Sequence, residues 1–314
     1  MNAQELSSER FAGRRSGFAS RRPGLADRRA GLEGRGRGLS RAKAKTIVAH
    51  VVIVCITLAT LYPILQIIGI SLRPADRLYT TSLRIIPPDA TGHAYYSVLF
   101  EKDFPLWLRN STIVSAIVTL IGVFLAATAG YAFSRFRFIA RKSGLYSLLI
   151  AQMFPATMLL LPLYVLMKGL HLLDSLGGLA VAYVATALPF CIWTMKGYYD
   201  TIPKELEEAA LIDGASYWHA FRTVVLPLAA PALAITAIFS FMAAWSEFMV
   251  ARVIINTRTL YTLPLGLESL SSTFQTEWAN YAAGSVLVSL PVVILFLFLN
   301  RYFVSGLTLG GVKQ

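Results

Sequence analysis

The chain has 314 residues, of which 55% are hydrophobic, and a formal net charge of +12. This apolar composition excludes an ordinary soluble domain and indicates several runs of about twenty apolar residues, the length that crosses a membrane. The positive charge is concentrated, because 12 of the 29 Lys and Arg residues lie within residues 1–45, alongside only four acids. No folded module or aromatic stacking platform accompanies these cations, so we expect no nucleic-acid partner.

Residues 1–45 contain a seven-residue repeat, which reads RRSGFAS, RRPGLAD, RRAGLEG and RGRGLSR over residues 14–41. A period of seven is typical of a coiled coil, but the glycines in every repeat and Pro23 disfavour a stable helix. We expect a disordered, cationic cytoplasmic arm that gains on the order of 1 kcal/mol per arginine near anionic membrane lipid. The alternatives are that the arm has no role, or that translation starts near residue 40.

Six apolar segments follow the arm and predict an all-α, polytopic membrane domain over residues 46–314. Each is close to the twenty residues that cross about 30 Å of hydrocarbon. Prolines inside these segments predict kinked helices whose freed carbonyls are satisfied by neighbouring helices. The predicted spans are residues 47–70, 112–133, 145–167, 177–195, 232–250 and 283–303.

The distribution of Lys and Arg predicts the orientation of these spans. With the N-terminus inside, the inner segments carry 21 of the 29 cations and the outer segments carry eight. Without the arm, the inner segments carry nine cations and the outer segments eight, so the count alone does not fix the orientation. The density of cations does, because residues 135–142 hold four of them in one short loop. By the positive-inside rule, both termini and the charged stretch 203–231 are predicted to be cytoplasmic.

The stretch 203–231 lies between two apolar segments and predicts two short helices joined by a glycine turn. Acidic residues at 205, 207 and 208 favour the positive end of the first helix. Gly214 suits the left-handed conformation that ends a helix, and Ser216 suits the cap of the next. The apolar stripe of the second helix is predicted to be Trp218, Phe221 and Val225. Such a hairpin has two possible roles. It either binds a partner and transmits that partner's movement to the membrane spans, or it is an amphipathic loop that lies on the lipid surface.

Parts of this hairpin stand in the register of a known motif. Glu208-Ala209-Ala210, Asp213-Gly214, Phe221 and Leu226-Pro227 resemble the EAA motif of ABC-importer permeases. Residues 107–111, 131–138, 152–155, 245–248 and 306–313 are similar to the MalG-type permeases of maltose/maltodextrin transporters. The resemblance covers roughly residues 46–314, and the arm has no counterpart in it.

The resemblance implies a permease subunit of an ATP-driven importer in the bacterial inner membrane. Its cargo would be maltose/maltodextrin-type sugars, with trehalose, another oligosaccharide or glycerol phosphate as alternatives. The partners would be a second homologous permease, an ATPase dimer that binds ATP and Mg, and an extracellular or periplasmic sugar-binding protein. The coupling loop, residues 201–231, would dock on the ATPase through Glu208, Ala209, Ala210, Asp213, Gly214, Phe221, Leu226 and Pro227.

The resemblance also implies a role for residues 256–282, between the fifth and sixth predicted spans. This external loop would reach into the cleft of the sugar-binding protein and help to dislodge sugar. The residues that suit a flexible polar probe are Gly266, Ser269, Ser271, Ser272 and Thr273. They suit any exposed loop equally well.

No catalytic motif is found, so we expect no enzyme activity and no cofactor on this chain. A phosphate-binding Gly-x-x-x-x-Gly-Lys-Ser/Thr loop is absent from the sequence, and the four histidines are scattered. Glu247, beside Trp245 in the fifth span, either is a functional residue within the membrane or is a paired or hydrated carboxylate at the membrane interface. Gln66 and Gln152 either face a polar path or form bonds between helices. The sequence predicts no sugar-binding residue.

Overall fold

The computed structural model describes residues 25–74, 84–271 and 276–310, and the side chains within 43–74, 84–271 and 276–299. The described chain is helical apart from connecting segments and one isolated bridge between Ser271 and Thr276. It divides into two compact units, Met1–Pro63 and Ile64–Gln314.

The helix α1 (Leu25–Ser71) begins well before the first predicted span. Residues 25–45, which the sequence predicts as part of a disordered arm, are helical in the structure and form the first turns of α1. The physical reason is cooperativity: once a helix is nucleated by the apolar segment, each further residue adds one hydrogen bond at little cost. The Leu, Ala and Arg residues of the repeat favour this extension, and each glycine opposes it by about 1 kcal/mol. Residues 1–24 lie outside the described part of the chain.

Four helical segments in the described residues are long and apolar enough to cross a membrane. Two further pairs of helices pass the same test only as bent pairs, so the six predicted spans are reached when each pair counts as one. The four segments are Lys43–Ser71 of α1, α3 (Phe104–Arg135), α6 (Leu176–Tyr199) and Trp278–Leu299 of α13 (Trp278–Gly310). They correspond to the first, second, fourth and sixth predicted spans.

The third predicted span, residues 145–167, is not one straight helix. The helix α4 (Arg141–Met153) stops at Phe154, which is extended, and η2 (Ala156–Leu159) and α5 (Leu160–Gly169) continue at 102° to it. Pro155 explains the break, because a proline lacks an N–H and disfavours helix at the residue before it.

The fifth predicted span, residues 232–250, is also divided. The helix α10 (Ala230–Trp245) ends before residues 246–248, and α11 (Met249–Ile254) follows. On its other side, the helical segment Tyr217–Leu228 meets α10 at 79°. The break at residues 246–248 was not predicted, whereas the bend before α10 lies next to the predicted boundary between the hairpin and the fifth span.

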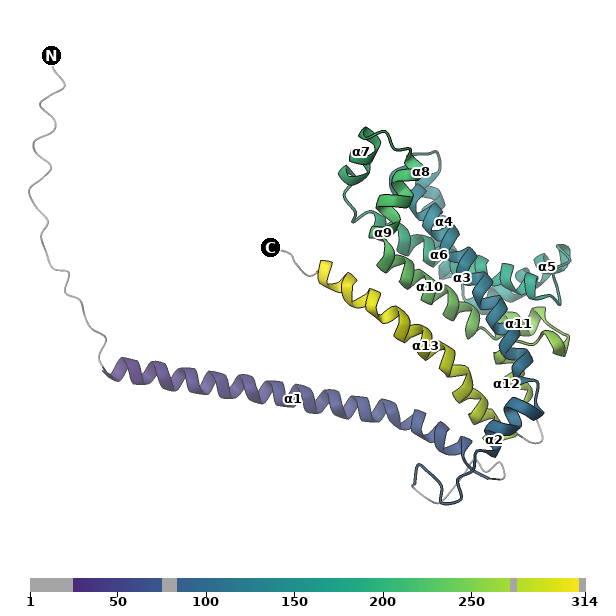
Figure 1. Ribbon diagram of the computed structural model, residues 1–314, viewed down its shortest axis with the longest axis horizontal. Helices are drawn as coiled ribbons and strands as arrows, with labels where there is room; N and C mark the ends of the chain where they lie inside the picture. The colour runs from purple at the N-terminus through teal and green to yellow at the C-terminus, as the bar shows by residue number, and fades with distance from the viewer. Residues whose placement is uncertain (1–24, 75–83, 272–275, 311–314) are drawn as a thin grey trace, which may run out of the picture. The chain divides into compact units, whose positions relative to one another are not determined.

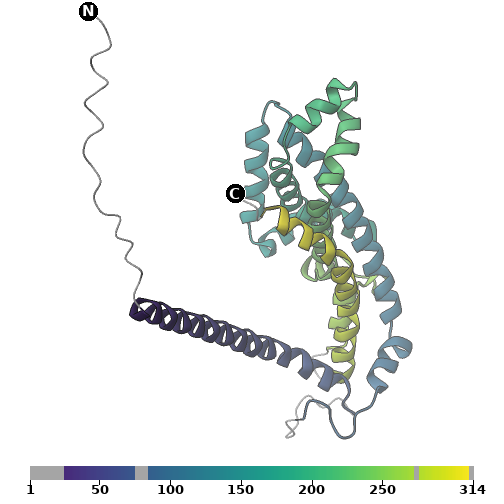
Figure 2. The ribbon, with the colours of Figure 1, turned by 60° about the vertical axis from the view of Figure 1, so that its left-hand side comes forward.

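The core of the second unit is formed by α3, α6 and α10, which pack along one another (Figures 1 and 2). At one end of this core lie α7 (Glu205–Ile212) and α8 (Tyr217–Ala220), and at the other lie α2 (His93–Tyr96) and α12 (Leu263–Ser269) (Figure 1). The π-helix η1 (Ser97–Glu101) connects α2 toward α3, and the short helix η4 (Arg258–Leu260) precedes α12. Buried side chains between the core helices include Val114, Val118, Ala126, Leu179, Tyr183, Met195, Ala232 and Ala244.

Candidate functional site

The hairpin, residues 201–231, turns at the predicted glycine. Gly214 has φ +86°, and its N–H donates to Leu211 O over 3.1 Å. The next N–H, of Ala215, donates to Ala210 O over 3.0 Å and closes the end of α7. Only glycine adopts this left-handed conformation without steric cost. No heavy atom lies within 4 Å of the place where a Cβ would stand, so the constraint at Gly214 is conformational.

The second half of the hairpin begins at the predicted cap. The Ser216 Oγ accepts from the His219 N–H at 3.2 Å, and α8 leads into the π-helix η3 (Phe221–Val225) and α9 (Leu226–Leu228). The predicted apolar stripe is confirmed in part. Phe221 and Val225 are buried, but Trp218 is 59% exposed.

The outward face of the hairpin carries apolar side chains that this chain does not cover. These are Leu206, Ile212, Tyr217 and Trp218, with Ile212 85% exposed. Glu208 is exposed on the same helix as Leu206 and Ile212. Exposed apolar side chains on one short segment favour a surface that meets a partner.

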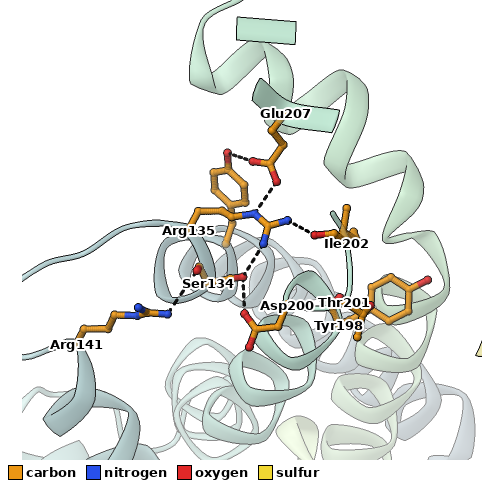
Figure 3. A network of polar contacts seen from close by, with 9 residues as sticks. Ser134, Arg135, Arg141, Tyr198, Asp200, Thr201, Ile202 and Glu207 are labelled. Atoms are coloured by element: carbon orange, nitrogen blue, oxygen red, sulfur yellow. Dashed lines mark hydrogen bonds and ion pairs between the residues drawn. The ribbon is translucent and has the colours of Figure 1, made fainter. Parts of the chain in front are cut away.

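The inward side of α7 is held by a carboxylate. Glu207 is the buried residue of this helix. Its Oε2 accepts from the Tyr131 Oη at 2.8 Å, and its Oε1 accepts from the Arg135 Nε at 2.5 Å (Figure 3). Both side chains of the ion pair are less than 10% exposed. Burying these charges requires such pairing, because an isolated buried charge is strongly unfavourable.

The guanidinium of Arg135 extends this contact into a network (Figure 3). Its Nη2 donates to Ile202 O at 2.9 Å, and its Nη1 donates to the Ser134 Oγ at 3.3 Å. The Ser134 hydroxyl in turn donates to Asp200 Oδ1 at 2.7 Å. Burial alone would raise the pKa of Asp200, but hydrogen bonds from Lys196 and Ser134 outweigh it and lower that pKa. The network joins the last turn of α3, the end of α6, the linker before α7 and α7 itself.

Sequence reasoning missed this network. The available signal was that Tyr131 and Arg135 stand four residues apart and therefore share one face of α3. Which of the adjacent residues Glu207 and Glu208 faces inward is decided only by how α7 lies on α3.

The structure separates the predicted coupling residues into an exposed group and a buried one. Phe221 is buried, and its ring centroid lies 4.5 Å from that of Tyr131. Ala210 and Leu226 are half-buried. The exposed residues of the set are Glu208, Ala209, Asp213, Gly214 and Pro227.

The polar residues predicted within spans have structural partners. The carboxylate of Glu247 accepts from the backbone N–H of Val250 at 3.0 Å and of Ala251 at 3.2 Å, which caps α11. Both predicted interpretations of Glu247 stay predictions. The Gln152 Nε2 donates to Thr186 O at 3.3 Å and joins α4 to α6. Gln66 lies half-buried in α1.

At the opposite end of the second unit, the loop 256–282 is attached by hydrogen bonds to its backbone. Asp174 accepts from the N–H groups of Asn256 and Thr257, both at 2.9 Å. The Asn110 Nδ2 donates to the carbonyls of Thr259 and Tyr261 at 2.9 and 3.0 Å. The Ser111 Oγ accepts from the Leu263 N–H at 2.7 Å.

The prediction of a flexible polar probe is wrong for Gly266, which is buried in α12. A Cβ at this glycine would stand 2.0 Å from the Trp107 ring, so close packing explains the residue. Ser269 is exposed but donates to Gly266 O at 2.6 Å within the same helix. Ser271 is exposed, and Ser272 and Thr273 lie outside the described residues.

No three His, Cys, Asp or Glu side chains gather to hold a metal ion in the part of the chain that the structure describes.

Residues 90–308 match the family model described as "Binding-protein-dependent transport system inner membrane component". The chain belongs to this family. It is 37% identical over 289 residues to the maltose/maltodextrin transport system permease protein MalG of Escherichia coli (strain K12), a match that covers 86% of this chain and 97% of that protein. It is 38% identical over 221 residues to the maltodextrin transport system permease protein MdxG of Bacillus subtilis (strain 168), covering 70% and 80%.

The fold is similar to that of a solved bacterial ABC transporter involved in the import of the acidic polysaccharide alginate. The TM-score is 0.73 at 24% identity, and the match covers 83% of this chain and 97% of the other. A second structure, of a bacterial alginate transporter in complex with alginate pentasaccharide-bound periplasmic protein, matches with a TM-score of 0.62 at 13% identity.

Family membership makes this permease a multi-pass membrane subunit of a transport system rather than an enzyme. The match to the E. coli permease extends over nearly the whole length of that protein.

Proposed function

We propose that this permease is a subunit of an ABC importer for maltose/maltodextrin-type sugars, and that separate ATPase subunits bind ATP and Mg. The two permeases from E. coli and B. subtilis support the cargo class, because their identity to this chain extends over most of its length. Trehalose, another oligosaccharide and glycerol phosphate are the alternative cargoes.

The observation that carries the proposal is the two-sided construction of the hairpin. Its outer side offers Leu206, Ile212, Trp218 and Glu208 to a partner, while Glu207 fastens its inner side to α3. We infer that the outer side sits in a cleft of the ATPase. When ATP closes the ATPase dimer, the hairpin is displaced and the population of the bundle shifts from inward-open to outward-open.

The remaining partners follow from the same assignment. A second homologous permease would enclose the pathway, and an external sugar-binding protein would dock near the loop 256–282. The solved alginate transporter with its bound periplasmic protein supports this kind of assembly. The cations of residues 135–142 lie beside the hairpin end, which supports a cytoplasmic hairpin and an external loop by the positive-inside rule.

The experiment that tests the lever is a pair of substitutions at the turn. Gly214→Val places a β-branched residue at φ +86° and should strain the hairpin by roughly 1–2 kcal/mol. Gly214→Asn is the matched control, because asparagine tolerates the left-handed region. We expect the valine variant to insert normally but to hydrolyse ATP without matching sugar uptake. Normal uptake by Gly214→Val in proteoliposomes would refute the lever.

A second measurement tests the class and the cargo. The complete transporter, reconstituted with its external binding protein, should import labelled maltotriose only when ATP is supplied on the hairpin side. Uptake by this chain alone, without an ATPase, would instead show a channel or secondary transporter. Calorimetry of the binding protein with maltotriose, trehalose and glycerol phosphate identifies the cargo.

A further inference from the structure

The helix α3 is attached at both ends to segments that meet partners under the proposed function, on which this inference rests. We propose that α3 carries the displacement of the hairpin to the loop 256–282. Arg135 and Glu207 are the positioning residues at one joint, and Asn110 is the positioning residue at the other.

The hairpin meets α3 through buried apolar side chains, Phe221 and Val225, and also through a carboxylate. The helix α7 packs on α8 and η3 of its own hairpin, and Glu207 is the residue that it buries. Tyr131 and Arg135, on successive turns of α3, each donate a hydrogen bond to one oxygen of that carboxylate. Charge-assisted, two-point contacts have a defined geometry, so α7 cannot slide along α3 as an apolar contact would allow.

The covalent routes out of the hairpin are bent. Toward α6 the chain passes through the connecting residues 200–204, and toward α10 it turns by 79°. Arg135 also reaches the first of these routes, because its Nη2 donates to Ile202 O. One side chain at the end of α3 therefore holds both the linker and α7.

The two joints lie on one continuous helix, α3, of 32 residues, and the stretch from Asn110 to Arg135 spans about 38 Å at 1.5 Å per residue. Its proline, Pro105, lies in the first turn, where proline causes no kink. Val114, Val118 and Ala126 bury it against α6 and α10. Close-packed interiors transmit displacement instead of absorbing it.

At the other joint, side chains of α3 form hydrogen bonds with the backbone of the loop 256–282. Asn110 is fully buried, and its amide donates to two carbonyls of the loop, at Thr259 and Tyr261. One residue further along α3, Ser111 accepts from the Leu263 N–H. A movement of this end of α3 must therefore move the loop or break buried hydrogen bonds.

The test follows the loop while the hairpin joint is weakened. In the complete transporter, with Cys55→Ser to remove the exposed thiol, a nitroxide on Ser271→Cys reports the ATP-dependent change in the loop. Glu207→Gln should reduce both that change and the sugar imported per ATP by roughly tenfold, within the range of measured coupling energies. Glu205→Gln, on the exposed side of the same helix, is the matched control and should stay within twofold of the parent.

A double-mutant cycle separates transmission from simple destabilisation. If the two joints act in series, Glu207→Gln combined with Asn110→Ala should be no worse than the more severe single variant. If the joints are independent, the two fold-changes multiply, and the inference is refuted. Hydrogen exchange of the α3 amides in each variant verifies that the core remains folded.

A milder variant covers the case in which Glu207→Gln fails to assemble. Tyr131→Phe removes one hydrogen bond and leaves the ion pair in place, so we expect a decrease of about fivefold in the loop response. A loop response within twofold of the parent in the assembled variant overturns the proposal. A parent transporter that shows no ATP-dependent uptake refutes the proposed function instead.

Discussion

The hairpin and the loop 256–282 lie at opposite ends of α3 and are held by different chemistry. The hairpin exposes Leu206, Ile212 and Trp218, and it is fastened by buried Phe221 and Val225 together with the ion pair of Arg135 and Glu207. The loop buries its apolar side chains, Leu263, Leu265 and Leu267, and is fastened by hydrogen bonds to its backbone.

The hairpin and the loop 256–282 also present different side chains to a partner. The hairpin offers an apolar face that gains free energy when it is covered. The loop buries Leu263, Leu265 and Leu267, while Ser271, Trp278 and Tyr281 are exposed.

The largest effect should come from breaking the hairpin attachment. Arg135→Ala leaves the Glu207 carboxylate buried without its cation, which costs about 3–5 kcal/mol. We expect the amides of α7 to exchange with deuterium much faster, while those of the loop 256–282 keep their protection. Exchange of α7 at the parent rate would contradict the comparison.

The matched control removes both charges. Arg135→Met combined with Glu207→Leu replaces the pair with apolar side chains, and such replacements are often nearly neutral in stability. The double variant should therefore protect α7 better than Arg135→Ala does.

A smaller effect should appear at the close contact in the loop. Gly266→Ala drives a methyl group into the Trp107 ring, and overpacking of this kind costs about 1–3 kcal/mol. Gly177→Ala is the control, because no heavy atom lies within 4 Å of its Cβ position in α6, and it should be neutral or stabilising. Denaturation of the purified protein measures both. Equal effects of the two substitutions would show that Gly266 is not tightly packed.

The smallest effect concerns the pH dependence of the loop attachment. Hydrogen bonds from the side chain and N–H of Thr257 and from the N–H of Asn256 lower the pKa of Asp174. A lowered pKa means that the contribution to stability is complete above the unfolded value, about 3.9, and is lost as pH falls through the folded value. Hydrogen-exchange protection of Asn256 and Thr257 should therefore persist at neutral pH and fall only below about pH 4. Asp174→Asn should remove this dependence.

The sequence was sufficient for several features of the hairpin. Gly214 and Ser216 were predicted as turn and cap because their chemistry acts within a few residues, and both are confirmed. It was insufficient for Gly266, which resembles a flexible loop glycine until Trp107, far away along the chain, is placed against it. It was misleading for residues 25–45, where local helix breakers are outweighed by continuity with the following helix.

The sequence by itself determined the membrane class, the helical hairpin and the family, because hydrophobic runs and motif register are properties of neighbouring residues. Only the tertiary structure decided that Glu207 faces inward while Glu208 faces outward, and that the loop 256–282 is attached to α3. Those choices depend on contacts between residues that are distant in the chain. Burial of a charge is favourable only when a specific partner such as Arg135 stands at hydrogen-bonding distance.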